Sequence, residues 1–508
     1  MDSNMESGQT KNTTEHVESL DDGRVAAQKE AQLTAFAPIV DPALEKRVIR
    51  KIDMMIIPFI CITYLITYVD KAMLGYSAVF GLKEGLHLHG TQYSWLGSMF
   101  YFGYLAFEYP TTFIMQKVPV SKWLSINLFI WGGITMALAG CSSFNSFLAL
   151  RFLIGAFESC STPAYLLITA TWYTIEEQPI RIGWWSTFLG VANSFGGLLA
   201  FGVGQINGSL QSWQYQFIFI GAISCVWSIF MFFTLAEHPS TAPWLKEEEK
   251  KAAVQRLGPR HPGANHREIK KYQIIEALTD PKTWLFFLCG VATQVVNGAA
   301  SNFGSLIIEG FGYSNLVTTL FQIPYGMVIL VSNVSAMYLQ RWLPGQKRCF
   351  VAILYICPAL AGAVGIHTIS RSHKAGLLVC YWLTSTYTAS FAMIMSLITA
   401  NTGGSTKRTV VNALFFVSYC VGNIVGPFSF KSNEAPTYTS GIVAMLVAYC
   451  VEIFLLLAFA GYAMTLNRKK EQVLNSQGMT LEDADLQTAD NVPVDQTDNQ
   501  DIFFRYSF

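Results

Sequence analysis

Charged residues are scarce in this sequence. Asp, Glu, Lys and Arg make up 13% of the 508 residues, whereas hydrophobic residues make up 52%. A soluble protein of this length carries more charge on its surface, so the composition excludes an ordinary water-soluble domain and indicates a membrane protein. The charges also balance, with 34 Lys and Arg against 34 Asp and Glu. Without a basic excess to neutralise phosphates, we expect no nucleic-acid partner.

The sequence also lacks paired cysteines. Its ten cysteines lie singly in apolar stretches, without a CxxC pair or an adjacent histidine cluster. This spacing predicts neither a disulfide framework nor a metal site. No HExxH or GxSxG motif indicates an enzyme. We therefore expect no cofactor, no bound metal and no catalytic residue.

Long apolar stretches recur along the chain. About twelve of them approach the ~20 residues that a helix needs to cross a lipid bilayer. They predict an all-α membrane protein with twelve transmembrane helices. The predicted spans are 53–75, 92–114, 123–141, 147–172, 183–206, 215–235, 284–303, 316–337, 350–369, 375–400, 409–428 and 439–462.

The spans fall into two groups of six. A charged segment at 236–283 separates them, and its composition indicates a partly helical cytoplasmic linker. We therefore expect a six-helix bundle at 52–235 and a second one at 284–462. The flanking segments, 1–51 and 463–508, are expected to be a largely disordered cytoplasmic N-terminus and a cytoplasmic tail.

Basic loops recur at similar positions in the two groups. The loops after spans two and eight, and those after spans four and ten, are separated by nearly the same number of residues. This recurrence indicates two parallel halves, a pattern of secondary transporters in which the substrate site lies between the halves near the membrane midplane. The alternative is that basic loops recur only because cytoplasmic loops are generally basic.

Lys and Arg are unevenly distributed over the loops. With an even number of spans, both ends of the chain lie on one side of the membrane. Fifteen Lys and Arg residues lie on that side, without the linker, and four lie on the other. The positive-inside rule therefore predicts that both termini are cytoplasmic.

Few charged residues lie inside the predicted spans. Each costs at least ~2.5–3.5 kcal/mol at mid-bilayer, so each is a candidate functional residue. Arg151, Gly155 and Glu158 share one helix face in the fourth span, and Gly155 lets another helix or a ligand come close. No cation lies one helical turn from Glu158, and burial favours the neutral form of a carboxyl group. Glu158 is therefore a candidate proton site. The alternative is a structural carboxyl bonded to a neighbouring helix.

Asp70 and Lys71 are adjacent, late in the first span. They either extend to the outer interface or lie within the outer leaflet, since apolar residues continue as far as Phe80. In a water-accessible cavity, Lys71 or Arg151 would attract an anion, and Arg can grip a carboxylate with two parallel hydrogen bonds.

Other polar residues in or near the spans have weaker signals. Glu108 precedes Pro110 near the cytoplasmic end of the second span, and with Lys117 it predicts a structural or gating ion pair. We place Arg181 and Arg408, from corresponding loops of the two halves, in the same structural or gating class. Uncharged polar residues in the second half are candidates to hydrogen-bond a substrate, although such residues more often join helices. They are Gln294, Asn297, Asn302, Gln322, Tyr325, Tyr419 and Asn423.

A family resemblance rests on short segments spread along the chain, namely Tyr68–Ala72, Gly81–Glu84, Gln92–Gly97, Gly103–Pro110, Arg151–Gly155, Asn401–Gly403, Lys407–Arg408, Gly422–Pro427, Thr497–Asn499 and Phe504–Tyr506. Together these segments resemble the fungal anion:cation symporters of the major facilitator superfamily. This branch includes the allantoate, nicotinate and pantothenate permeases. The resemblance covers about residues 45–508.

The resemblance implies the major facilitator fold and proton-coupled uptake of a small organic anion, such as a carboxylate-bearing vitamin or ureide. It also implies a monomer in the plasma membrane. In related bacterial symporters, an Asp-Arg pair in span one and an Arg and a Glu in span four carry proton coupling and anion binding. These positions match Asp70, Lys71, Arg151 and Glu158. By resemblance, Asp70 and Glu158 would couple protons, and Lys71 and Arg151 would bind the substrate. From the polar residues of the second half we add Gln294, Asn297 and Tyr419 as substrate-binding candidates.

Two other functions are compatible with the sequence. One is an exporter of the same fold that moves a metabolite outward, although the fifth span has no Gly-Pro step of the kind found in proton-antiporting drug exporters. The other is a nutrient sensor that carries no flux. For such a sensor, a long signalling tail would be expected.

Overall fold

The structure is a computed structural model that describes residues 41–174, 176–257, 269–343, 347–476 and 495–508. Within these residues every regular element is a helix, so the predicted all-α class is confirmed. Of the predicted disordered N-terminus, residues 1–40 fall outside the described residues, whereas 42–51 are helical, which differs from the prediction. Part of the predicted tail also falls outside the described residues.

The first half contains six helical spans in the predicted order. Its fourth span is interrupted directly after Glu158, so that α6 and α7 share it. The helices are α2 (Pro42–Val79), α4 (Gln92–Met115), α5 (Val120–Leu138), α6 (Phe144–Glu158), α7 (Ser161–Trp172), α8 (Gln178–Gly204) and α9 (Ser212–Thr234), with the short α3 (Leu82–Gly85) after α2.

The second half also contains six spans. Its tenth span is interrupted after Thr384, so the fourth and tenth spans are both broken near mid-length. The helices are α12 (Pro281–Glu309), α13 (Asn315–Leu320), α14 (Gln322–Trp342), α15 (Arg348–Thr368), α16 (Lys374–Thr384), α17 (Tyr387–Asn401), α18 (Ser405–Val425) and α19 (Thr439–Ser476), with 3₁₀ turns η2 (Gly426–Ser429) and η3 (Ser432–Glu434). Between the halves lie η1 (Pro239–Thr241), α10 (Glu247–Leu257) and α11 (Lys271–Thr279).

Each half starts with an Asp-Pro step. The Asp41 side chain accepts a hydrogen bond from the Ala43 N–H at 3.0 Å, and Asp280 accepts one from the Lys282 N–H at 3.0 Å. These carboxylates satisfy backbone donors that a helix leaves free at its start. The prolines have no N–H to leave free and suit the first helical position. The sequence therefore sets where both bundles begin.

Ten helical spans of the described chain are long and apolar enough to cross a membrane. The second and third predicted spans, α4 and α5, are not among these ten. Polar residues lower their hydropathy, including Glu108 in α4 and Lys122 and Asn127 in α5. Both helices still pack within the first half, α4 against α6 and α5 against α9. Packing against other helices compensates for their polarity.

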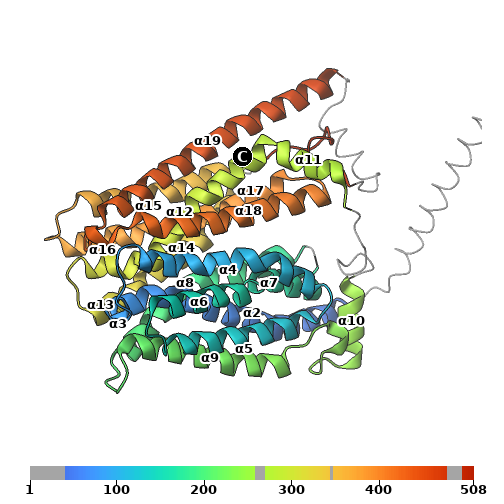
Figure 1. The fold of residues 1–508 in the computed structure, drawn as a ribbon. Coiled ribbons are helices and arrows are strands. Elements are labelled where there is room, and N and C mark those ends of the chain that lie inside the picture. Colours follow the sequence, from blue (N-terminus) through green and yellow to red (C-terminus); the bar gives the residue numbers. More distant parts are fainter. Residues whose placement is uncertain (1–40, 175, 258–268, 344–346, 477–494) are drawn as a thin grey trace, which may run out of the picture.

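The two halves lie side by side as two helical bundles (Figure 1). Across their interface α2 packs against α12, α4 against α18 and α8 against α14. The start of α2, the end of α19 and the helices α10 and α11 lie at one end of the molecule, which we call the terminal face. The opposite end, which carries α3, is the loop face.

Contacts between the halves are close near the loop face. The Tyr93 hydroxyl of α4 donates to the carbonyl oxygen of Asn302 at 2.7 Å, and the Ser94 hydroxyl donates to that of Pro427 at 2.9 Å. Gly75 of α2 abuts α12, since a Cβ there would lie 2.7 Å from a backbone oxygen of that helix. These contacts close the loop-face end of the interface.

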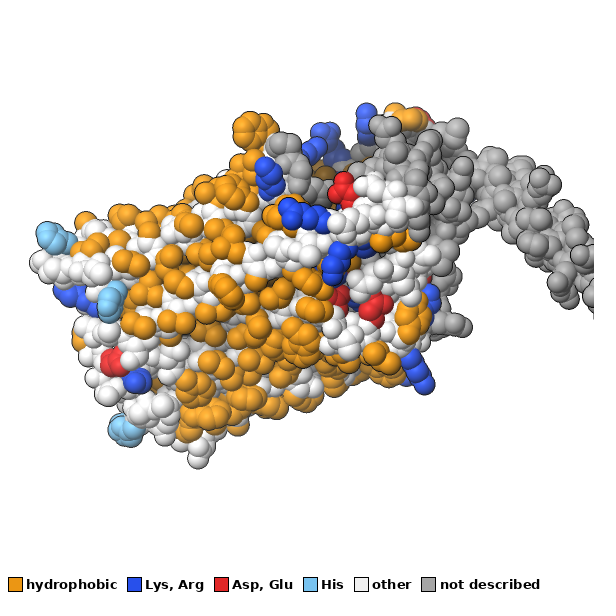
Figure 2. All heavy atoms as spheres, turned by 90° about the horizontal axis from the view of Figure 1, so that it is seen from above, with side chains coloured by type: hydrophobic (Ala, Val, Ile, Leu, Met, Phe, Trp, Pro, Cys, Tyr) orange, Lys and Arg blue, Asp and Glu red, His pale blue; other side chains and the backbone are white. Residues whose placement is uncertain are grey.

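The surface carries a broad belt of hydrophobic side chains, with charged side chains gathered toward the ends (Figure 2). Val226, Phe233, Phe350 and Phe454 are among the exposed apolar residues. An apolar surface this continuous would be unstable in water and fits the hydrocarbon of a bilayer.

Candidate functional site

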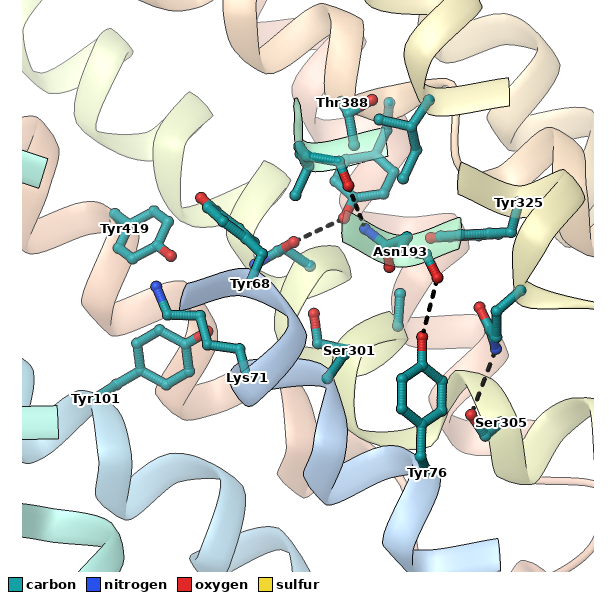
Figure 3. Close-up of a pocket in the computed structure, with 17 residues that line it drawn as sticks. Tyr68, Lys71, Tyr76, Tyr101, Asn193, Ser301, Ser305, Tyr325, Thr388 and Tyr419 are labelled. Carbon is teal, nitrogen blue, oxygen red and sulfur yellow. Dashed lines mark hydrogen bonds between the residues drawn. The ribbon is translucent and has the colours of Figure 1, made fainter. Parts of the chain in front are cut away.

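A polar cavity lies at the interface of the two halves (Figure 3). Among its described lining residues Lys71 is the one charged side chain, and six are tyrosines. Such a lining suits a small anion that carries further hydrogen-bonding groups. The polar lining residues are Tyr68, Lys71, Tyr76, Tyr101 and Asn193 from the first half, and Asn297, Ser301, Ser305, Gln322, Tyr325, Tyr387, Thr388 and Tyr419 from the second.

Lys71 is held at the cavity wall by a carboxylate and by aromatic rings. Its ammonium nitrogen lies 2.8 Å from Oε1 of Glu158. It also lies 4.8 Å from the ring centre of Tyr68 and 5.4 Å from that of Tyr104. Ring faces attract a cation, so these contacts keep the ammonium group at the cavity while Glu158 neutralises it.

Glu158 is the last residue of α6, at the interruption of the fourth span. Its side chain is fully buried. No cation lies one turn away on the same helix, but the interpretation that the buried Glu158 has no close cationic partner is wrong. Spacing along one helix reveals only partners on that helix, whereas Lys71 comes from α2. The carboxylate is thus buried behind the one charged group of the cavity wall.

Asp70 lies inside the first bundle, one residue before Lys71. It is buried, and its Oδ2 accepts a hydrogen bond from the indole Nε1 of Trp131 on α5 at 3.0 Å. The helix α2 continues to Val79. This placement excludes the alternative in which Asp70 and Lys71 extend to the outer interface.

Arg151 is buried against α4 and is not among the cavity-lining residues. Its Nε donates to the carbonyl oxygen of Leu96 at 3.2 Å, and its guanidinium lies 5.6 Å from the ring centre of Phe100. The approach depends on Gly155, because a Cβ there would lie 1.9 Å from the Phe100 carbonyl oxygen. The prediction that Gly155 lets a helix come close is confirmed. In this conformation Arg151 contacts α4 and lies outside the layer of residues that line the cavity.

Asp70, Lys71, Arg151 and Glu158 form one electrostatic group. Asp70 and Glu158 both interact with Arg151 and Lys71. The group contains two carboxylates and two cations, so its formal charge is zero when all are ionised. Buried charges persist only when they are balanced in this way. An additional anion in the cavity would need an additional positive charge.

The second half contributes an amide network. Asn297 lines the cavity, donates from Nδ2 to Oδ1 of Asn423 at 2.9 Å and accepts from the Tyr387 hydroxyl at 2.9 Å. Asn423 in turn donates to Oε1 of Gln294 at 2.9 Å. Gln294 therefore supports the network and does not line the cavity, which differs from its predicted role in binding. Tyr419 does line the cavity.

The predicted gating residues lie away from the cavity. Arg181 forms a two-pronged ion pair with Asp53, with N–O distances of 3.1 and 3.2 Å, and ties α8 to α2. Arg408 donates from Nε and Nη2 to the Thr402 carbonyl oxygen.

The predicted ion pair between Glu108 and Lys117 is not formed in the structure. The Lys117 ammonium group lies 4.5 Å from the ring centre of Phe113. Helix α4 ends at Met115, so Lys117 follows the helix and turns toward its end. The predicted pair assumed that the helix continues past Lys117, whereas it ends two residues earlier.

Several site residues were not predicted. Tyr68 stands one turn before Lys71, so helical spacing alone could have paired them. Asn193 is a polar residue within the fifth span. The criterion that selected polar residues inside the spans of the second half would also have selected Asn193 in the first half. Nothing local in the sequence indicates that Trp131 bonds Asp70. Within the described residues, no group of His, Cys, Asp and Glu side chains is placed to hold a metal ion.

Comparisons with known proteins agree with this architecture. The profile of the Major Facilitator Superfamily matches residues 60–427. Among solved structures, a bacterial homologue of the human lysosomal transporter Spinster, in an inward-facing conformation, superimposes with a TM-score of 0.61. The match covers 83% of this chain and 99% of that one, at 15% identity. This likeness concerns the fold alone.

Two fungal relatives are similar over nearly the whole chain. An uncharacterized transporter of Schizosaccharomyces pombe is 37% identical, over 91% of this chain and 86% of its own length. The allantoate permease of Saccharomyces cerevisiae is 34% identical, over 92% of this chain and 87% of its own length. The chain therefore belongs to the Major Facilitator Superfamily and is a multi-pass membrane transporter, a secondary carrier of small solutes and not an enzyme.

Proposed function

We propose that the protein is a proton-coupled symporter that takes up a small organic anion across the plasma membrane. The observation that carries this proposal is the ion pair between Lys71, on the cavity wall, and the buried Glu158, 2.8 Å apart. The similarity to an allantoate permease supports a carboxylate-bearing solute as the substrate class.

The coupling follows from competition for one ammonium group. While Glu158 is ionised, it forms an ion pair with Lys71. A substrate carboxylate in the cavity would then be a second anion beside the same cation. When Glu158 takes up a proton, the Lys71 charge becomes available to the substrate. Proton and anion therefore bind more tightly together than either binds alone, which is the thermodynamic requirement of a symporter.

Charge balance sets the expected stoichiometry. The group of Asp70, Lys71, Arg151 and Glu158 is neutral when ionised. One proton added with one monovalent anion keeps it neutral, so a monocarboxylate should move with one proton. Asp70 is the second candidate to take the proton, and we assign Arg151 to balancing the two carboxylates.

The test is transport by purified protein in liposomes loaded with a pH-sensitive dye. Labelled allantoate, nicotinate and pantothenate are the probes. An imposed gradient, acidic outside, should drive accumulation of at least one probe together with proton influx. A membrane potential should have little effect on a monocarboxylate. Proton movement opposite to that of the probe would contradict symport and favour the metabolite exporter.

We infer that the terminal face is cytoplasmic, from the basic residues on that side. The close contacts between the halves near the loop face would then lie toward the outside of the cell. Residues 207–209 connect α8 and α9 at the loop face and are exposed. An epitope tag placed after Gly208 should therefore bind antibody on intact cells. Binding only after permeabilisation would reverse the orientation.

Replacing Trp131 by Phe tests whether Asp70 shares the proton step with Glu158: if it does, the pH dependence of uptake should shift while uptake persists. The indole N–H donates to the Asp70 carboxylate, so its loss changes the balance between the neutral and ionised forms of that group. Loss of one such hydrogen bond corresponds to about 1 pH unit, or about 1.4 kcal/mol. The measurement is the initial uptake rate over about 3.5 pH units, from about 4.5 to about 8.

The matched control for this variant is Trp227→Phe. Trp227 also donates its indole N–H within the first half, but to the Thr63 hydroxyl at 2.9 Å and not to a carboxylate. Its replacement should leave the pH profile in place. An unshifted profile for Trp131→Phe would remove Asp70 from the proton step.

A further inference from the structure

Residues 495–508 lie against the terminal face of the second half, beside α11 (Figure 1). The segment begins with Asp495 and contains the motif Thr497-Asp-Asn499, which the transport site does not use. Thr497 and Asp498 are completely buried although they belong to no helix. Burial of a polar segment outside regular structure requires specific partners.

Asp498 has the most extensive set of these partners. Its carboxylate forms ion pairs with Lys282 of α12 and with Lys407 of α18, the latter at 2.9 Å. It also accepts hydrogen bonds from the Gly403 N–H at 3.1 Å and from the Tyr506 hydroxyl at 3.0 Å. The two lysines are buried, so Asp498 joins two buried cations from different helices.

Asp495 binds the start of α18. Its carboxylate accepts hydrogen bonds from the Ser405 N–H at 2.6 Å and from the Ser405 hydroxyl at 2.8 Å, and it pairs with Lys270 at 3.0 Å. The backbone N–H groups at a helix start are free to bind an anion. Asp495 thus caps a transmembrane helix from a distant part of the chain.

The end of the segment pairs through its backbone. Tyr506 exchanges two hydrogen bonds with the side-chain amide of Asn467 on α19, both at 2.9 Å. Ser507 exchanges two with the amide of Asn401, at 2.7 and 2.9 Å. Paired hydrogen bonds to backbone N–H and C=O groups are a usual way of binding an extended peptide.

We propose that the terminal face of the second half is a peptide-binding site, that its ligand is this chain's own segment 495–508, and that the bound segment braces α11, α12, α18 and α19 as one unit. The ligand class is a short peptide with three aspartates followed by an aromatic Phe-Arg-Tyr sequence. Asp498 and Asp495 supply the charge, and the residues around Tyr506 supply the backbone pairing.

The location of the contacts decides what the segment does. Outside the segment itself, every partner named above lies between Lys270, directly before α11, and Asn467 of α19. All of them therefore belong to α11 and the second half. A segment that joined the two halves would hold the carrier in one state, and its release would free transport. Because this segment ties one half to itself, its release should loosen that half and lower its stability.

The two docking aspartates do not titrate near neutrality. Burial would raise the pKa of Asp495, but hydrogen bonds from Ser405 and the ammonium group of Lys270 lower it to about 2. Lys282 and Lys407 likewise outweigh burial and hold the pKa of Asp498 below its ordinary value. Carboxylates with lowered pKa stabilise docking above their unfolded values near ~3.9 and lose this effect only in stronger acid. Both aspartates therefore remain ionised, and keep their partners, at any pH near neutrality.

The first test uses the full chain and Gly403→Ala. A Cβ on Gly403 would lie 2.6 Å from the Asp498 backbone nitrogen, so the methyl group excludes the segment directly. Gly461→Ala on α19 is the control, since a Cβ there meets nothing within 4 Å. Hydrogen exchange of residues 495–508 should be slow in the wild type and the control, and at least about tenfold faster in Gly403→Ala. The melting temperature should fall only in Gly403→Ala.

Two results of this test would overturn the proposal. Exchange of residues 495–508 at the rate of the free peptide in the wild type would show that no site is occupied. An unchanged melting temperature in Gly403→Ala with a released segment would remove the bracing role. Neither readout depends on which solute is carried or on proton coupling.

The second test supplies the ligand separately. A chain that stops after residue 494 should bind a labelled synthetic peptide of residues 495–508 saturably. The full chain should not bind it, because its site is filled. A peptide with Asp498→Asn should bind at least about tenfold more weakly, as expected for loss of charged hydrogen bonds. Equal binding by the two peptides, or equal binding by the full and shortened chains, would contradict a specific site.

Discussion

Glu158→Gln should abolish net proton-driven accumulation of substrate while exchange of internal for external substrate continues. Gln keeps the shape of the side chain but fixes it in a neutral state. In that state Lys71, 2.8 Å away in the wild type, is free for a substrate carboxylate. Substrate should bind at least as well as in the wild type. The carrier then cannot release a proton, and the empty return step, which net uptake requires, is blocked.

The measurement compares net uptake under an imposed proton gradient with counterflow in the same liposomes. Glu452→Gln is the matched control. Glu452 is also a fully buried carboxyl within a membrane helix, but it lies in α19 and accepts a hydrogen bond from Ser390 at 2.7 Å. That variant should keep both activities. Net accumulation at the wild-type rate by Glu158→Gln would remove Glu158 from the coupling step and leave Asp70 as the candidate.

The fold was predictable because each membrane span is marked in the sequence by a long apolar run. Each span is an apolar run of about bilayer length, and the helices lie close to the predicted ranges. The positions of the helix ends were harder to predict from the sequence. Helix α2 begins at Pro42, before the predicted start of its span, because the Asp41-Pro42 step starts a helix in polar sequence. Helix α19 continues to Ser476, past the predicted end, where its residues contact segment 495–508.

The site was predictable only where its partners lie on one helix. The spacing of Arg151, Gly155 and Glu158 correctly indicated a close helix approach at Gly155. The pairing of Lys71 with Glu158 joins α2 to α6, and the bond from Trp131 to Asp70 joins α5 to α2. Such contacts depend on how helices pack, and one sequence carries no local signal for them. The ends of the chain gave even less indication that Asp498 would meet Lys407.

Lys71→Met should weaken substrate binding by about tenfold to a hundredfold, the loss expected for a charged hydrogen bond of about 1.5–3 kcal/mol. Met has a similar length and no charge. The variant removes the one cation among the described cavity-lining residues. It also leaves Glu158 buried without its partner, and an unpaired buried charge is itself destabilising. Binding measured on the single variant would therefore mix two effects.

The double variant Lys71→Met, Glu158→Gln separates them. It removes both members of the ion pair, so no unpaired charge remains in place of the 2.8 Å contact. If Lys71 binds the substrate directly, affinity in the double variant stays as weak as in Lys71→Met, because no cation faces the anion. If Lys71 serves only to neutralise Glu158, affinity returns to the wild-type value. Recovery of binding would therefore refute Lys71 as the anion site, whereas persistent weakness with a wild-type melting temperature would place the substrate carboxylate at this ammonium group.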